Sequence, residues 1–186
     1  MGKVYEELDE GLVDFIGRQH VFFVGTAPDS PDGHLNISPK GLDTFHILGP
    51  KAVAYLDLTG SGIETVAHLR ENGRMTIMFC AFEGAPMILR LYGRGRVVEP
   101  GDPEWDGLVA AFPPRLGIRS VVVLEVDRIA DSCGYGVPVY EYRRGRTQLA
   151  DWTSRKGPSG LEQYKAQENR KSIDGLDGLR RPGSPE

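Results

Sequence analysis

The sequence predicts a mainly β protein in which six to eight antiparallel strands form a small barrel accompanied by a few helices. Short β-branched and aromatic runs recur along the chain, and most connections between them are too short for crossover helices. One long run also carries Gly93 and Gly95 in its interior. Interior strand glycines mark bulges or sharp bends of the kind needed at barrel corners, so the long run should turn such a corner.

The first half is expected to contain a helix, a hairpin and two further strands. Leu8, Leu12, Phe15 and Ile16 recur at helical spacing, and the run "HVFFVGTA", the turn "PDSPDG" and the run "HLNISPKG" predict a hairpin. The strand "TFHIL" ends at Gly49, and "KAVAYLDL" follows as the next strand.

In the second half of the chain, helices and strands are expected to follow one another. "ETVAHLREN" predicts a helix closed by Gly73, followed by the strands "RMTIMFCAF" and "MILRLYGRGRVV". "PEWDGLVAAF" predicts a short helix, "SVVVLEVDRIA" a strand, and "PVYEYRRGRT" a last hairpin arm.

After Asp151 the sequence becomes polar and rich in glycine and proline. We therefore expect a barrel domain over residues 1–150 and a polar arm over residues 151–186, with one helix around Leu161 to Arg170. The embedded Trp152 and Tyr164 favour an arm docked on a dimer partner, and a disordered tail is the alternative.

Composition excludes several function classes. The 186 residues have a formal net charge of -4 and no long basic run, which argues against nucleic-acid binding. Cys80 and Cys133 are far apart and the four histidines are scattered, so we expect no metal site and no disulfide framework. No apolar run approaches the roughly 20 residues of a membrane span, and no signal core is evident, so a cytoplasmic protein is expected.

The stretch "TGSGIETVAHL", Thr59 to Leu69, has two interpretations. Ser61 and Glu64 have the spacing of a helix capping box. The same helix start could instead hold a phosphate, because Gly60 and Gly62 allow close approach to free backbone amides, and the hydroxyls of Thr59, Ser61 and Thr65 could add donors. In "NISPKG", Ser38 and Lys40 share one strand face just before Gly41, and Lys40 could neutralise that phosphate.

The order "NISPKG", "AYLDLTGSGIETVAHLRENGRMTIMF" and "ILRLYGRGRVV" resembles the pyridoxamine 5'-phosphate oxidase-like family of flavin-binding split β-barrels, from about Phe15 to Val98. The resemblance implies a homodimeric oxidoreductase that binds flavin mononucleotide (FMN) and acts on a small molecule. It implies that Lys40, Ser61, Gly62 and Thr65 hold the FMN phosphate, and that the flavin ring lies beside Ser38, Pro39, Tyr55, Leu56 and Asp57.

Two departures limit what the resemblance implies. True pyridoxamine phosphate oxidases carry an Arg-Lys pair at the helix start, where this chain has Ile63, Glu64 and Thr65, and they end in an Arg-x-His segment that "LRRPGSPE" lacks. The vitamin substrate is therefore not implied. A deazaflavin-dependent reductase and a non-catalytic flavin- or haem-binding protein stay open, and no catalytic residue is assigned.

Three arginines of the long strand, Arg90, Arg94 and Arg96, share one face. Their default role is cross-strand ion pairing with Glu125 and Asp127. The alternative for Arg94 is contact with a cofactor phosphate from the neighbouring subunit.

Overall fold

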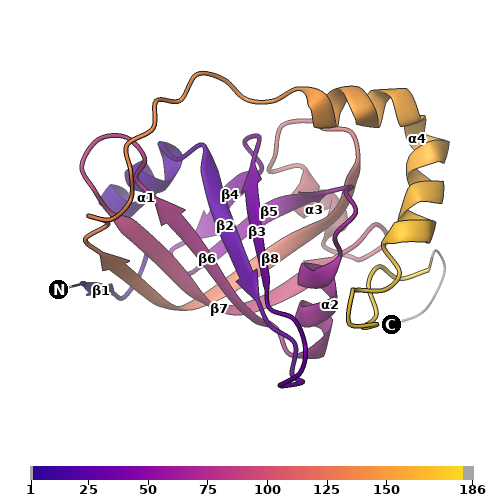
Figure 1. Ribbon diagram of the computed structural model, residues 1–186, viewed down its shortest axis with the longest axis horizontal. Helices are drawn as coiled ribbons and strands as arrows, with labels where there is room; N and C mark the ends of the chain where they lie inside the picture. The colour runs from indigo at the N-terminus through magenta and orange to yellow at the C-terminus, as the bar shows by residue number, and fades with distance from the viewer. Residues whose placement is uncertain (1, 182–186) are drawn as a thin grey trace.

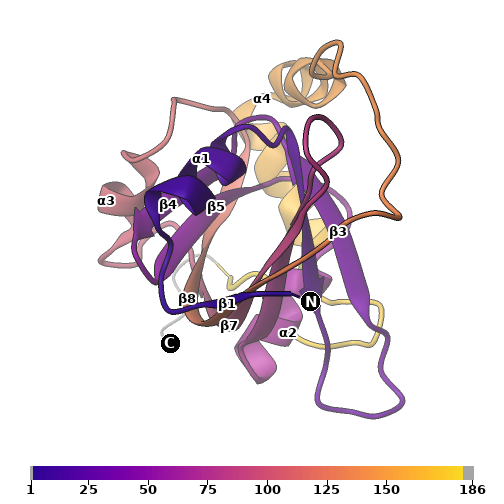
Figure 2. The ribbon, with the colours of Figure 1, turned by 90° about the vertical axis from the view of Figure 1, so that its left-hand side faces the viewer.

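The computed structural model describes residues 2–181, and the strands in that range form one antiparallel sheet curled into a half-barrel (Figures 1 and 2). The strands are β1 (Val4–Tyr5), β2 (Val21–Thr26), β3 (Asn36–Gly41), β4 (Phe45–Gly49), β5 (Ala52–Leu58), β6 (Arg74–Cys80), β7 (Ile88–Val98) and β8 (Ile118–Ser132). The helices are α1 (Glu10–Gly17), α2 (Glu64–Glu71), α3 (Trp105–Val109) and α4 (Gln148–Glu168). The predicted fold class and the hairpin of β2 and β3 are confirmed.

The sheet has the strand order β3-β2-β6-β7-β8-β5-β4, and β1 pairs with β8 off this path. Its curled interior holds the main core, to which β5 contributes Val53 and Tyr55. The alternate side chains of β5, Ala54 and Leu56, pack in a second cluster with the side chains of α3. Because both faces of β5 are covered, its sequence is a nearly continuous apolar run.

The predicted bend in the long strand is confirmed. The register between β7 and β8 shifts between Tyr92 and Gly93. A Cβ atom at Gly93 would lie 1.9 Å from the backbone oxygen of Glu125, so only glycine allows β8 to pass this closely.

The capping box predicted for α2 does not form. The helix begins at Glu64, its N-cap is Ile63, and no side chain caps it. Glu64 Oε1 instead accepts a bond from the Ile173 amide at 3.3 Å, which draws this carboxylate toward the C-terminal segment.

The predicted last hairpin arm is wrong, because residues 137–147 contain no strand. The Val137 amide donates to a carbonyl in the preceding turn. Two further bonds, donated by the Tyr140 and Tyr142 amides, connect the segment to the β6–β7 loop. Isolated bonds of this kind do not make a ladder.

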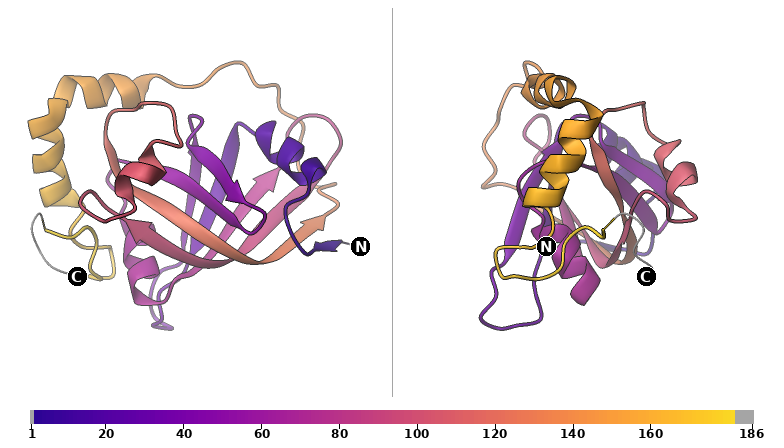
Figure 3. Two further views of the ribbon diagram at one scale, coloured as in Figure 1. Left: turned by 180° about the vertical axis from the view of Figure 1, so that it is seen from behind. Right: turned by 90° about the vertical axis from the view of Figure 1, so that its right-hand side faces the viewer.

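The helix expected around Leu161 begins much earlier, at Gln148, and ends at Glu168. It bends sharply at Gly157, where φ is 66°, and Pro158 follows (Figure 3). Proline suits the first turn of a helix, since its missing N–H would have no partner there. The Gly-Pro pair therefore joins two helical segments and does not end the helix.

Residues 169–181, here called the C-terminal segment, pack against their own barrel. Leu179 is buried against Ile63 and Val66 of the α2 start, and the Arg180 guanidinium pairs with Glu99 and Asp102. Residues 182–186 of the predicted arm lie outside the described range.

Candidate functional site

A small pocket of about 220 Å³ lies where the α2 start meets β3, the end of β5 and the beginning of β8. It is lined by Ser38, Pro39, Lys40, Leu58, Gly60, Gly62, Glu64, Thr65 and Arg119. The structure thus brings five of the predicted cofactor-binding residues together: Ser38, Pro39, Lys40, Gly62 and Thr65.

A buried ionic network forms one wall of this pocket. Lys40 Nζ lies 3.1 Å from Asp57 Oδ1, and Arg119 Nε lies 2.7 Å from Asp57 Oδ2. Burial by itself raises the pKa of Asp57, but the Arg119 and Lys40 charges and their hydrogen bonds outweigh it and lower that pKa to about 2. Asp57 is therefore ionised and holds both cations beside the pocket.

The start of α2 forms a second wall, to which Glu64 and Thr65 contribute. Ala67 donates the first helical bond, to the Ile63 carbonyl, so the amides of Glu64, Thr65 and Val66 have no backbone acceptor within residues 2–181. Free amides at a helix start, together with the helix dipole, favour an anion.

A third group of polar side chains connects β3 to α2. Asn36 Nδ2 donates to Thr65 Oγ1 at 3.0 Å, and Ser38 Oγ donates to Asn36 Oδ1 at 3.0 Å. Because Asn36 already supplies a donor to Thr65, the Thr65 hydroxyl can donate its own hydrogen, and the buried Tyr55 hydroxyl is one acceptor beside it.

The remaining predicted residues lie elsewhere. Thr59 is buried and donates to the Gly117 carbonyl, Ser61 is exposed beside the pocket, and the side chains of Tyr55 and Leu56 lie in the two cores. Tyr55 and Leu56 are 0% and 1% exposed, so neither presents a surface to a ligand.

Arg94 lies outside the pocket, and the ion pairing expected of its strand face does not form. Arg94 stands opposite Glu125, yet its guanidinium donates to the Asn72 carbonyl at 2.7 Å. This carbonyl ends α2, where the helix dipole attracts a cation. Arg96 pairs with Glu104 instead.

Sequence reasoning missed three residues of the site: Asn36 as the bridge, Arg119 as the second cation and Asn169 as a brace. Asn169 Nδ2 donates to the Gly60 carbonyl at 2.8 Å, so the C-terminal segment holds the glycine turn from outside. A sequence signal existed for Arg119, because it lies at the beginning of the apolar strand β8. In the structure only 5% of its side chain is exposed. An arginine buried to this degree needs an anionic partner.

Two other site classes find no support within residues 2–181. No group of three potential metal ligands is assembled there. In the same range, none of the helices has the length and apolar character required to cross a bilayer.

Comparison with known proteins gives the family. The family model described as "Pyridoxamine 5'-phosphate oxidase" matches residues 8–133, which include the whole pocket. The chain belongs to the pyridoxamine 5'-phosphate oxidase family. This family member is also 41% identical over 194 residues to the pyridoxamine 5'-phosphate oxidase family protein ustO of Aspergillus flavus, with 94% of this chain and 77% of that protein covered.

Solved structures of related proteins share the fold of this family member. HupZ of Group A Streptococcus is 22% identical with a TM-score of 0.50, covering 65% of this chain and 90% of that one. A Lactobacillus delbrueckii structure named for pyridoxamine 5'-phosphate oxidase is 20% identical with a TM-score of 0.51, covering 68% and 98%. These likenesses support the split β-barrel fold.

Proposed function

We propose that this chain binds FMN and places the FMN phosphate in the small pocket at the α2 start. The observation that carries the proposal is the meeting of two cations, Lys40 and Arg119, with free helix amides in one 220 Å³ pocket. This volume is below the roughly 300 Å³ at which pockets begin to hold whole drug-sized ligands, so it suits a phosphate group with the rest of the nucleotide outside.

The flavin ring is proposed to lie along β3 and the end of β5. The pairing of β4 with β5 reaches only Tyr55, so the edge of β5 from Asp57 onward has no strand partner on that side. Leu35, directly before β3, and Ile37 on β3 are 78% and 74% exposed. Exposed apolar side chains beside an edge strand are expected to be covered, and we propose that a second copy of this chain covers them in a homodimer.

The division into residues 1–150 and residues 151–186, the docking of the arm on the partner and the contact of Arg94 with the partner's phosphate stay predictions. Within the described chain, residues 169–181 contact their own barrel.

The proposed activity is that of an oxidoreductase acting on a small molecule. Bound FMN would supply the hydride or electron transfer. The chain's own residues hold and orient the nucleotide: the positive charges of Lys40 and Arg119 lie beside its phosphate, and the Asn36 bridge directs the hydroxyl of Thr65. The low pKa of Asp57 keeps both cations in place at neutral pH.

The visible spectrum of the purified protein, followed by reconstitution with FMN, tests the proposal. A flavin spectrum supports it, whereas a haem spectrum, a deazaflavin spectrum or a colourless protein that ignores added FMN contradicts it. A turnover assay with reduced nicotinamide and candidate acceptors then separates an enzyme from a binding protein.

A pair of variants tests the phosphate position. Lys40→Met removes one charge-assisted contact of about 1.5–3 kcal/mol, so FMN should bind about 10- to 100-fold more weakly. Lys51→Met changes an exposed lysine outside the pocket and should leave the affinity unchanged. Equal FMN affinity in the two variants would contradict the proposed phosphate position.

A further inference from the structure

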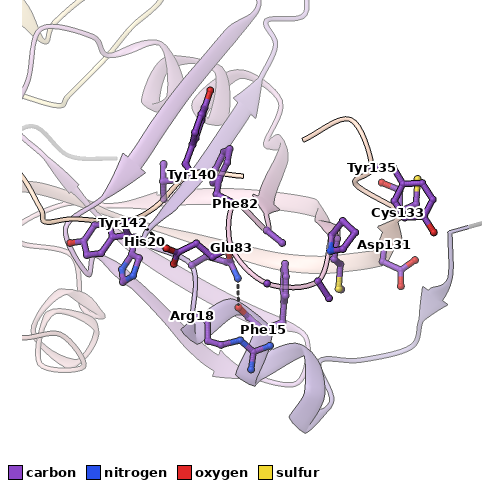
Figure 4. Close-up of a pocket in the computed structure, with 18 of the residues that line it drawn as sticks. Phe15, Arg18, His20, Phe82, Glu83, Asp131, Cys133, Tyr135, Tyr140 and Tyr142 are labelled. Carbon is purple, nitrogen blue, oxygen red and sulfur yellow. Dashed lines mark hydrogen bonds between the residues drawn. The ribbon is translucent and has the colours of Figure 1, made fainter. Parts of the chain in front are cut away.

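A second, larger cavity lies at the opposite end of the barrel from the phosphate pocket. Its volume is about 1020 Å³, and it is enclosed by the end of α1, the β6–β7 loop, the end of β8 and residues 135–142 (Figure 4). It shares no lining residue with the small pocket. β6 runs from Arg74 beside α2 to Cys80 beside the cavity, about 20 Å at 3.3 Å per residue.

Aromatic side chains form the walls of this cavity. The rings of His20 and Tyr142 stack with centroids 3.6 Å apart, and those of Phe82 and Tyr140 stack at 5.5 Å. Both pairs are visible in Figure 4, with Phe15 and Tyr135 also lining the space. The stacks fix the positions of these rings in the cavity lining, where aromatic side chains can contact an occupant.

The same stacks hold residues 135–142 at the cavity. The Tyr140 amide donates to the Phe82 carbonyl at 2.9 Å, and the Tyr142 amide donates to Glu83 Oε1 at 2.9 Å. Glu83 Oε2 has no partner among residues 2–181, so one oxygen of this carboxylate stays available to a ligand.

Charge in the lining is mainly negative. Glu83, Asp131 and Glu141 line the cavity with a single cationic side chain, Arg18. No ion pair joins Arg18 to these carboxylates in the described range. Asp131 is already engaged by the Lys3 amide and the Tyr5 hydroxyl, both at 2.6 Å, which leaves Glu83 and Glu141 as the open acceptors.

We propose that this cavity is a second ligand site that takes an aromatic amine or another flat aromatic cation. Aromatic faces attract cations through the ring quadrupole, and unneutralised carboxylates add ordinary charge attraction. The volume is at the upper end of the roughly 300–1,000 Å³ of small-molecule pockets, so a two-ring molecule fits with room for its side chain. The proposal does not depend on flavin binding.

Two probes of nearly equal shape and opposite charge test the proposal on the full chain as purified. Tryptamine carries an ammonium group where indole-3-propionate carries a carboxylate. Titration calorimetry should show tryptamine binding at least about tenfold more tightly. Glu83→Gln keeps an acceptor for the Tyr142 amide but removes the charge, and should weaken tryptamine about fivefold or more without changing the weak binding of neutral 3-methylindole. Glu125→Gln, an exposed carboxylate outside the cavity, is the matched control.

A thiol readout locates the binding. Cys133 is exposed in the cavity lining and Cys80 is buried, so iodoacetamide should modify Cys133 selectively. Tryptamine, and not indole-3-propionate, should slow that modification in the wild type and less so in Glu83→Gln. Equal binding of both probes, no binding, or binding that leaves the modification rate unchanged would overturn the proposal. A Cys133 that is unreactive in a dimer but reactive on dilution would also overturn it, since the cavity would then be an interface between copies.

Discussion

Replacing Asp57 with asparagine should lower stability and raise anion affinity at the same time. The Asp57 carboxylate is fully buried and accepts hydrogen bonds from Lys40, Arg119 and Ser120. Asparagine keeps the volume but turns an amide nitrogen toward these donors. Removing one partner of a buried ion pair costs about 3–5 kcal/mol. For a chain of this length that corresponds to a fall in melting temperature of roughly 10 °C.

The expected change in anion affinity has the opposite sign. Two basic and two acidic side chains line or support the pocket, so the formal charges of Lys40 and Arg119 balance those of Asp57 and Glu64. Asp57→Asn leaves one net positive charge. A unit charge about 6 Å from a phosphate interacts by about 3 kcal/mol at an effective dielectric constant of 20, and solvent screening reduces this. We therefore expect about tenfold tighter binding of FMN or inorganic phosphate.

Thermal melting in phosphate and in chloride at equal ionic strength, together with FMN titration, measures both effects. Asp127→Asn is the matched control, because Asp127 is exposed on β8. A variant at position 57 that melts like the wild type, or that binds phosphate more weakly, would refute the assignment of Asp57 as the residue that neutralises the two cations.

The same carboxylate should give a pH dependence. The pKa of Asp57 is lowered from 3.8 to about 2, so its contribution to stability is fully present above pH 3.8 and is lost as the pH falls through about 2. At 1.36 kcal/mol per pKa unit the loss is about 2 kcal/mol, and urea unfolding from pH 5 to pH 2 should show a fall that Asp57→Asn lacks.

Further predictions concern the bend and the brace. Gly93→Ala should prevent β8 from approaching β7 and cost several kcal/mol, measured by urea unfolding, because its Cβ would meet the Glu125 backbone oxygen. Gly107→Ala has no atom within 4 Å of the new Cβ and should be tolerated; equal effects of the two would contradict this account. Asn169→Ala should cost about 1–3 kcal/mol and weaken FMN retention by loosening the glycine turn, whereas exposed Gln167→Ala should do neither. An Asn169→Ala protein that retains FMN like the wild type would show that the brace does not support the site.

Most of the fold could be predicted because local pattern and tertiary structure agree. The alternating pattern of β2 and β3 indicates a hairpin, and the apolar run of β5 indicates burial on both faces. The interior glycines of β7 indicate its bend. The predictions are wrong where a contact between residues distant in sequence determines the local structure. Glu64 has capping-box spacing, but the amide of Ile173 attracts its carboxylate. The run "PVYEYRRGRT" has strand composition but finds no strand edge to pair with.

The site was predictable in outline for the same reason. Ser38, Lys40, Gly62 and Thr65 belong to short motifs whose chemistry is visible in the chain. The supporting residues are not close to them in sequence: Arg119 lies 62 residues after Asp57 and Asn169 lies 109 after Gly60. Such pairings follow from strand order and from the path of the C-terminal segment, which one sequence does not reveal.

The position of the brace affects how shortened versions of the protein should be designed. The family match stops at residue 133, yet the amide of Asn169 secures the turn on which the nucleotide proposal depends. A protein truncated at residue 133 would therefore lose a support of this turn, and its failure to bind FMN would say little about the intact protein.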